Sequence, residues 1–226
     1  GSTGATLISA ITVLGKQKGV IRPAIASVLP ISDGSVILLD SGASLDVKPK
    51  VLYQFAVMGS KLAEALFDIE SPKIGLLNNG EEESKGRELE KSAFKLLNSS
   101  SLNFIGNVEG RDFATSKVDV FVTDGFTGNV VLKTLEGTAK LQQNLISDSL
   151  KQNLFKPFIP SVKKALKPVK DQLNPDKTNA SYLLGVNGLV TIGHGSSKQE
   201  AIMNGINYTN ESINKDFIGK FSDAIR

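Results

Sequence analysis

Short apolar runs rich in β-branched residues alternate with amphipathic helical patterns along most of this chain of 226 residues. The run Val36–Leu39 is apolar without a break, which is typical of a strand whose two faces are both buried. This alternation predicts an α/β fold, a three-layer α/β/α sandwich in which helices cover both faces of a mainly parallel sheet. The predicted strands are 24–28, 36–40, 73–78, 103–106, 118–123 and 189–193.

Two helices are predicted from local signals. Pro49 suits the first position of a helix that runs towards Phe67, because its ring fixes φ and no N–H group is needed there. A second helix is predicted from Gly86 to Leu97, where apolar and charged residues recur at helical spacing. In such a fold, ligands bind beyond the carboxyl ends of the strands, so the loops that follow strands are the expected location of a site.

Composition limits the classes of function. The chain is 40% hydrophobic, which suffices for one core, and we expect a single α/β domain over residues 1–226. Its 26 Lys and Arg nearly balance 23 Asp and Glu, so net charge gives no argument for binding nucleic acid. Cysteine is absent, which excludes disulfides and Cys nucleophiles and fits a reducing cytoplasm. With one histidine and no cysteine, neither a metal site nor a cofactor is predicted.

The hydropathy of the chain and its first residues bear on membrane insertion and on the extent of the domain. No run approaches the roughly 18 apolar residues of a membrane span and no signal-peptide pattern is present, so we expect a soluble or peripheral protein. The chain begins Gly1-Ser2-Thr3-Gly4-Ala5, without an initiating Met. We interpret this start as the interior of a longer domain whose N-terminal part is missing; a vector remnant at Gly1 and Ser2 is the other interpretation.

One segment interrupts the α/β pattern. Residues 141–175 are predicted to form an inserted, basic, amphipathic arm, because no acidic residue lies between Ser149 and Lys170. Pro157, Pro160 and Pro168 forbid one unbroken helix, so we predict a protruding hairpin of two short helices that meet at the Pro-Phe-Ile-Pro bend. Apolar residues with a basic collar are typical of a reversible contact with an anionic membrane. The predicted membrane-binding residues are Phe155, Lys156, Phe158, Ile159, Lys163 and Lys164.

Four loops place glycine beside hydroxyl, amide or charged residues just before a helical pattern. They cover residues 2–5, 77–86, 123–129 and 192–197. Glycine lets backbone N–H groups approach an anion, and the dipole of a helix N-terminus favours negative charge. A helix cap alone would explain any one of these loops, but their repetition predicts one shared anion site. None of them matches a nucleotide-binding motif.

Four polar residues are candidates for chemistry. His194 is the only histidine, and its flanking glycines leave the ring free to meet a ligand, although a structural role is equally open. Lys85 follows three glutamates, and a solvated surface lysine is the alternative there. Glu109 and Arg111 could bind substrate or form an ion pair that holds their loop.

Several blocks of residues resemble a known family. They are Leu39-Asp40-Ser41-Gly42-Ala43 with Lys48-Pro49, then Gly75–Glu82, Asn103–Asp112, Asp124–Val130 and His194–Ser197. In this order, over nearly the whole chain, they resemble the phosphate acyltransferase family of bacterial phospholipid synthesis. The resemblance implies a fold like that of isopropylmalate dehydrogenases and phosphotransacetylases, and usually a homodimer. It further implies transfer of an acyl group from acyl carrier protein to inorganic phosphate.

For that reaction we predict three catalytic residues: Lys85, His194 and Asp124. The predicted phosphate-binding and substrate-binding residues are Thr3, Gly4, Asn78, Gly80, Asn107, Glu109, Arg111, Gly125, Thr127, Gly128, Asn129, Gly195, Ser196 and Ser197. Two alternatives stay open, a short-chain phosphotransacetylase or phosphotransbutyrylase that uses coenzyme A thioesters and a non-catalytic membrane scaffold. The basic arm could also serve a dimer interface or the docking of acidic carrier protein. An early Asp-x-Met-Gly-Gly-Asp motif of the family is absent from this chain.

Overall fold

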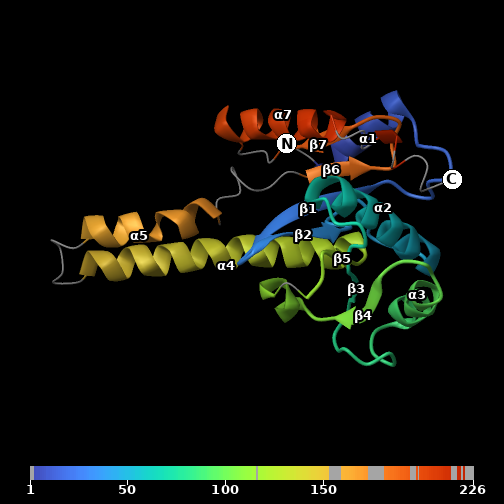
Figure 1. Cartoon of the computed structure of the whole chain (residues 1–226), viewed down its shortest axis with the longest axis horizontal. Helices are drawn as coiled ribbons and strands as arrows, with labels where there is room; N and C mark the ends of the chain where they lie inside the picture. Colours follow the sequence, from blue (N-terminus) through green and yellow to red (C-terminus); the bar gives the residue numbers. More distant parts are fainter. Residues whose placement is uncertain are drawn as a thin grey trace.

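A single mixed β-sheet forms the centre of the molecule (Figure 1). The computed structural model describes residues 3–115, 117–152, 159–172, 181–193, 197, 199–214, 218–219 and 221. Within this part of the chain the sheet has 7 strands in the order β4-β3-β5-β2-β1-β6-β7. The strands are β1 Ala24–Ile31, β2 Gly34–Leu39, β3 Ile74–Leu77, β4 Phe104–Val108, β5 Val120–Val122, β6 Ser181–Leu184 and β7 Val190–Ile192.

The sheet is parallel in one half only. Strands β4, β3, β5 and β2 are parallel neighbours, whereas β2 pairs antiparallel with β1, β1 with β6 and β6 with β7. The prediction of a mainly parallel sheet was therefore wrong. For β1 and β2 the physical reason is the short link from Ile31 to Gly34, which leaves room only for a hairpin. Gly34 has a φ of 101°, as a tight turn requires. Strand β6 was not predicted.

Helices cover both faces of the sheet, which confirms the three-layer α/β/α sandwich. Alternate residues of β2 point to opposite faces. Ile37 and Leu39 pack in the cluster that includes Phe55 of α2, whereas Leu38 packs in the cluster that includes Val131 of α4. The helices are α1 Thr3–Leu14, α2 Pro49–Phe67, α3 Glu88–Asn98, α4 Gly125–Gln152, α5 Ile159–Gln172 and α7 Gln199–Asn214, with a short 3-10 helix η1 at Gly110–Ala114.

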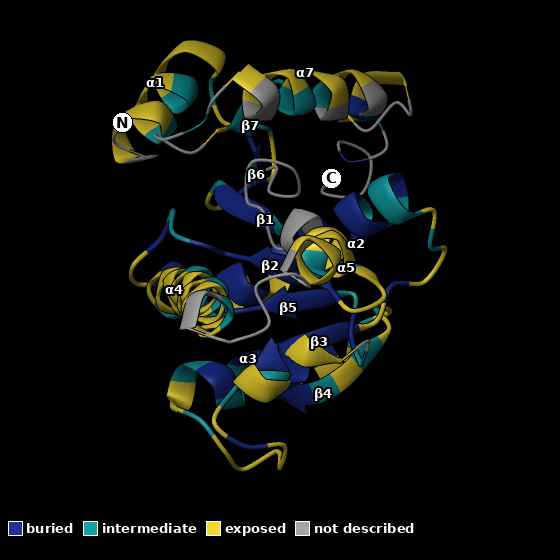
Figure 2. Cartoon of the chain, turned by 90° about the vertical axis from the view of Figure 1, so that its left-hand side faces the viewer, coloured by how far each residue is buried: buried dark blue, intermediate teal, exposed yellow. Residues whose placement is uncertain are grey.

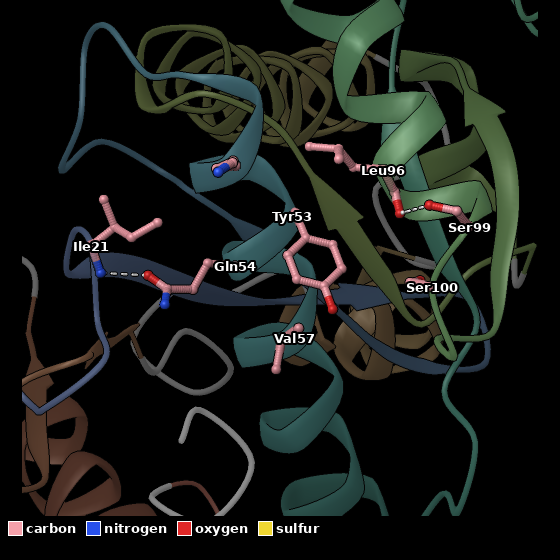
Figure 3. A pocket seen from close by; sticks show the side chains of 8 residues that line it. Ile21, Tyr53, Gln54, Val57, Leu96, Ser99 and Ser100 are labelled. Atoms are coloured by element: carbon pink, nitrogen blue, oxygen red, sulfur yellow. Dashed lines mark hydrogen bonds between the residues drawn. The ribbon is translucent and has the colours of Figure 1, made fainter.

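Helix α2 begins and ends where the sequence predicts. Pro49 occupies its first turn, and the apolar stripe that includes Leu52, Phe55 and Leu62 is buried. The opposite side of the helix stays accessible and lines a groove with Ile21 and the end of α3 (Figure 3). Pro49 and the helical spacing of apolar residues thus suffice to define this element.

The segment predicted as a basic arm contains two helices that extend away from the sheet (Figure 1). Helix α4 is a single helix of 28 residues, longer than predicted, and α5 contains Pro168. Figure 2 shows the two helices nearly end-on and apart from each other, so a packed hairpin stays a prediction. Phe155, Lys156 and Phe158 lie outside the described residues, as does the side chain of Ile159. Within the described residues, the helices are too short or too polar to cross a membrane.

Candidate functional site

The loops after β2, β3 and β5 contact one another at one edge of the sheet. Gly125 donates its N–H to the carbonyl oxygen of Ser44 over 2.8 Å, and Asp40 donates its N–H to Thr123 over 3.0 Å. Arg87, from the loop after β3, pairs with Asp124, which follows β5. The neighbouring strand β4 joins them, because Asn78 donates its N–H to the carbonyl of Val108 over 2.7 Å. Polar groups of four parallel strands therefore meet where a ligand is expected.

Asp40 is a buried carboxylate at the centre of this edge. Its Oδ1 accepts N–H groups from Ile25 at 3.1 Å, Gly42 at 3.1 Å and Ala43 at 2.9 Å, and its Oδ2 accepts the N–H of Ser44 at 2.8 Å. Burial raises the pKa of Asp40, and the backbone N–H groups oppose that rise. The carboxylate thereby ties the start of β1 to the loop after β2. The sequence prediction did not include Asp40, although it lies in one of the blocks that carry the family resemblance.

Asp124 caps the N-terminus of α4. Its Oδ1 accepts the N–H of Thr127 at 2.7 Å and its Oδ2 accepts the hydroxyl of Thr127 at 3.1 Å. Gly128 donates its N–H to the carbonyl of Asp124 over 2.9 Å. The N–H groups of Gly125, Thr127 and Gly128 are thus already bonded, so an anion at this turn must displace one of these acceptors or bind through side chains. Asn129 donates through Nδ2 to the carbonyl of Ser41 over 3.3 Å.

The glycines of this turn allow close packing. A Cβ atom on Gly125 would lie 2.5 Å from the carbonyl oxygen of Ser44. One on Gly128 would lie 1.9 Å from the carbonyl oxygen of Asp40, well inside van der Waals contact. Neither glycine has a left-handed φ. The sequence predicted a glycine-lined anion cradle, whereas the structure shows that these two glycines let α4 approach the loop after β2.

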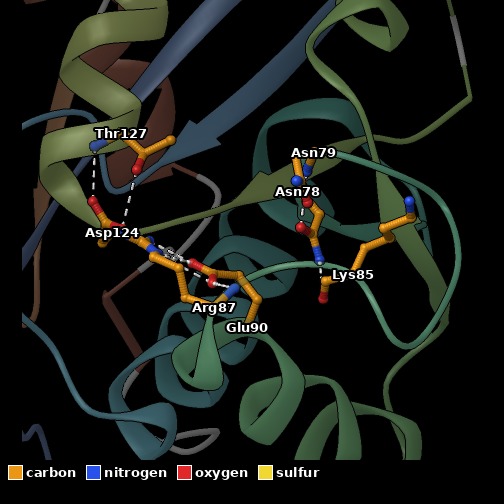
Figure 4. A network of polar contacts seen from close by, with 7 residues as sticks. All are labelled: Asn78, Asn79, Lys85, Arg87, Glu90, Asp124 and Thr127. Atoms are coloured by element: carbon orange, nitrogen blue, oxygen red, sulfur yellow. Dashed lines mark hydrogen bonds and ion pairs between the residues drawn. The ribbon is translucent and has the colours of Figure 1, made fainter.

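Arg87 links the loop after β3 to α4 and was missed by the sequence prediction (Figure 4). Its guanidinium binds the carboxylates of Glu90 and Asp124, both buried, while 60% of its own side chain remains exposed. The hydrogen bond to Glu90, and to a lesser extent the one to Asp124, raises the pKa of Arg87 above its ordinary value. A cation just after Gly86 and next to a predicted helix start is the signal that could have found it.

Lys85 lies in the same loop but points elsewhere. Figure 4 shows its side chain directed away from Arg87 and Asp124. Its Nζ lies 4.0 Å from Glu82, and its backbone carbonyl accepts Nδ2 of Asn78 at 3.2 Å. A Cβ on Gly80 would come within 2.8 Å of the Lys85 side chain, so the loop is compact. The structure brings Asn78, Gly80 and Lys85 together but does not place the Lys85 amine at the Asp124 turn.

The residues predicted after β4 form a neighbouring cluster. Arg111 pairs with Glu109 on the same turn, as the alternative interpretation expected. Asn107 donates through Nδ2 to the carbonyl of Glu82 over 2.8 Å, and its Oδ1 is buried without a hydrogen-bond partner among the described residues. Lys117 joins this cluster to the acidic loop through Glu81. The β4 residues thus hold the loop after β3 in place.

The remaining predicted residues lie apart or outside the described chain. Thr3 and Gly4 begin α1, which packs through Leu7, Ala10 and Ile11 beside β6 and β7. His194, Gly195 and Ser196 lie outside the described residues, and Ser197 is described only as an isolated position. Strand β7 runs antiparallel to β2, so its carboxyl end faces the opposite edge of the sheet. A site shared with the loop after β7 stays a prediction, because His194, Gly195 and Ser196 lie outside the described residues. Within the described chain, no cluster of three or more His, Asp or Glu could hold a metal ion.

Comparison with known sequences identifies the family. A family model described as "Fatty acid synthesis protein" matches residues 1–220. The chain is 44% identical over 232 residues to the phosphate acyltransferase of Thermosipho melanesiensis, covering 100% of this chain and 68% of that protein. It is also 44% identical over 226 residues to the phosphate acyltransferase of Pelotomaculum thermopropionicum, covering 66% of it. The chain belongs to the phosphate acyltransferase family. It spans about two thirds of the length of these family members.

Solved structures agree on the fold. The EutD phosphotransacetylase from Staphylococcus aureus matches with a TM-score of 0.57 at 15% identity, over 94% of this chain and 60% of that one. A branched-chain phosphotransacylase from Enterococcus faecalis V583 matches with a TM-score of 0.57 at 14% identity, over 94% of this chain and 70% of that one. This phosphate acyltransferase family member therefore has a phosphotransacetylase-like fold, as predicted.

Proposed function

We propose that this protein transfers a long-chain acyl group from acyl carrier protein to inorganic phosphate and so supplies acyl phosphate for phospholipid synthesis. The observation that carries the proposal is the identity of 44% to phosphate acyltransferases over the whole chain. These 226 residues contain no cysteine, so this part of the protein supplies no cysteine acyl-enzyme. A direct attack of phosphate on the thioester fits this composition.

The reaction demands orientation more than strong base catalysis. A phosphate oxygen attacks the thioester carbonyl carbon, a tetrahedral oxyanion forms, and the C–S bond then breaks to release the carrier thiolate, which takes up a proton. Phosphate is already ionised near neutral pH, and a thiol with a pKa of about 8.5 leaves readily. The protein must therefore hold two anionic partners together and offset their charge.

The edge where β2, β3 and β5 end supports this role. Helix α4 is 28 residues long and directs its N-terminus at this edge, where the helix dipole favours an anion. Arg87 adds a guanidinium that is held by Asp124 yet largely exposed. In this proposal Thr127, Asn129 and Arg87 bind phosphate oxygens and Asp124 positions the turn. Lys85 and His194 neutralise charge and deliver the proton, which requires the Lys85 side chain, directed away from Asp124 in this structure, to turn towards the bound substrate.

The two proposed charge-carrying residues give the first test. In the full-length enzyme, Lys85→Ala and His194→Ala are each expected to lower the initial rate of acyl phosphate formation by roughly 100-fold, as loss of a positioned acid or charge does. Lys95→Ala, at an exposed position about two turns after Arg87 on α3, removes one positive charge away from the site and serves as the control. Rates near wild type in both variants would exclude this assignment. The same assay with a coenzyme A thioester in place of the acyl carrier protein thioester tests the short-chain phosphotransacetylase alternative, which predicts the faster rate with coenzyme A.

The basic arm supports a peripheral membrane contact as a further part of the proposal. Lys163 and Lys164 are exposed on α5, and each lysine near an anionic surface contributes about 1 kcal/mol. The chain carrying Phe155→Ser, Phe158→Ser and Ile159→Ser is expected to lose flotation with anionic liposomes. A triple serine variant of Ile202, Met203 and Ile206, exposed on α7, removes as many apolar side chains and is expected to float normally. Equal flotation of both variants would exclude Phe155, Phe158 and Ile159 as the membrane contact.

A homodimer also remains a prediction. Exposed apolar side chains along α4, among them Val130, Leu141 and Leu145, are compatible with a subunit interface.

A further inference from the structure

A groove of about 530 Å³ lies on the outer side of α2, and neither Asp124 nor Arg87 is among its described lining residues. Figure 3 shows Ile21 and Gln54 on one side of Tyr53, with Leu96 and Ser99 on the other. The volume falls within the range of about 300 to 1,000 Å³ that is typical of sites for small molecules. The lining residues are Ile21, Lys50, Tyr53, Gln54, Val57, Leu96, Ser99 and Ser100.

One wall of the groove is fixed by a side-chain clamp. Gln54 of α2 accepts the N–H of Ile21 through Oε1 at 2.6 Å and donates through Nε2 to the carbonyl of Gly19 at 2.8 Å. Both hydrogen-bonding groups of the amide thus bind the segment before β1 to the helix. Ile21 is consequently held over the groove, with 48% of its surface exposed. The apolar wall exists before any ligand arrives, which lowers the entropy cost of binding.

The two ends of the groove differ in charge. Among the described lining residues Lys50 alone is charged, and it lies in the first turn of α2, close to the edge where β2 ends. At the other end, the hydroxyls of Ser99 and Ser100 donate to the carbonyls of Leu96 and Leu97 at the C-terminus of α3. A helix C-terminus carries partial negative charge, so an anionic group is favoured at Lys50 and disfavoured at Ser99. Between the two ends lie the apolar surfaces of Tyr53, Val57 and Leu96.

We propose that this groove binds a fatty acyl anion, with its charged head at Lys50 and its aliphatic chain along Tyr53, Val57 and Leu96. Along α2, Val57 lies seven residues after Lys50, a rise of about 10 Å at 1.5 Å per residue, and the lining continues to Leu96 and Ser99 of the α3 end. The choice of a fatty acyl chain over other amphiphiles rests on the proposed function, whereas the site rests on the lining alone. The groove is a binding site separate from the transfer reaction.

The test uses saturated fatty acids without phosphate or thioester, so its outcome is independent of acyl transfer. The protein is titrated with a fluorescent polyene fatty acid, which is then displaced by decanoate, dodecanoate and tetradecanoate. Each added methylene is expected to tighten binding by about two- to fourfold, because each contributes its transfer free energy. Decanol, which has the chain of decanoate and no charge, is expected to bind at least fivefold more weakly.

Substitutions locate the binding. Lys50→Glu and Tyr53→Ser are each expected to weaken dodecanoate binding about tenfold, and both positions are exposed enough to change without unfolding the chain. Lys140→Glu, on the exposed side of α4, reverses the same charge elsewhere and is expected to leave binding unchanged. The proposal is overturned if displacement is not saturable, if Lys140→Glu weakens binding as much as Lys50→Glu, or if decanol binds as well as decanoate. Acyl transfer that persists when dodecanoate binding is lost would leave the proposed function intact.

Discussion

Gly128→Ala is expected to lower the free energy of unfolding by about 3 kcal/mol, as overpacking against a rigid neighbour does. The new Cβ would lie 1.9 Å from the carbonyl oxygen of Asp40, and a backbone atom cannot move aside as a flexible side chain can. The N-terminus of α4 must then shift away from the loop after β2. Equilibrium unfolding in urea measures the change.

Gly137 provides the matched control for this substitution. It lies in the same helix, and a Cβ there would meet nothing within 4 Å. Gly137→Ala is therefore expected to raise the free energy of unfolding by about 0.5 to 1 kcal/mol, because alanine has the higher helix propensity. Equal stability of the two variants would show that α4 does not approach Asp40 as closely as described.

Asp124→Ala is expected to reduce kcat/KM for acyl phosphate formation by about 100-fold in the full-length enzyme. The substitution removes the cap that fixes Thr127 and releases Arg87, and a displacement of about 1 Å at a reacting centre can cost this much. The loss of the cap is expected to lower the free energy of unfolding by only about 0.5 to 2 kcal/mol. The rate of acyl phosphate release and a urea titration give the two values.

Asp124→Asn separates position from charge. Asparagine caps a helix about as well as aspartate, so the turn should keep its shape while the ion pair with Arg87 is lost. We expect a loss in kcat/KM of less than about tenfold, together with stability close to wild type. If Asp124→Ala keeps the wild-type kcat/KM, the N-terminus of α4 takes no part in the reaction. If Asp124→Asn loses 100-fold in kcat/KM, the negative charge of Asp124 is what matters rather than the shape of the turn.

Lys85 and Arg87 show where prediction of the site from sequence reached its limit. Both are cations in the loop after β3, and sequence favoured Lys85 because it follows an acidic run. In the structure Arg87 reaches Asp124, while Lys85 points away from it (Figure 4). Side-chain direction within a loop depends on the backbone path, which no local pattern encodes.

Gly125 and Gly128 were predicted to form part of an anion cradle, and the structure shows a packing reason for glycine at both positions. Sequence indicated room for an anion, whereas the structure indicates room for Asp40 and Ser44. Both interpretations require the absence of a Cβ, so composition alone does not distinguish them. The difference is a contact between residues about 85 positions apart, a separation that local reasoning does not cover.

The sequence by itself determined the α/β class and the extent of α2, because the periods of strands and helices and the position of Pro49 act over neighbouring residues. Only the tertiary structure decided that the sheet is half antiparallel and that Asp40, Arg87 and Asp124 meet. Arg87 and Asp124 are 37 residues apart and come together because β3, β5 and β2 are neighbours in the sheet. Strand order is fixed by the packing of the whole core, and that packing is not a property of any single segment.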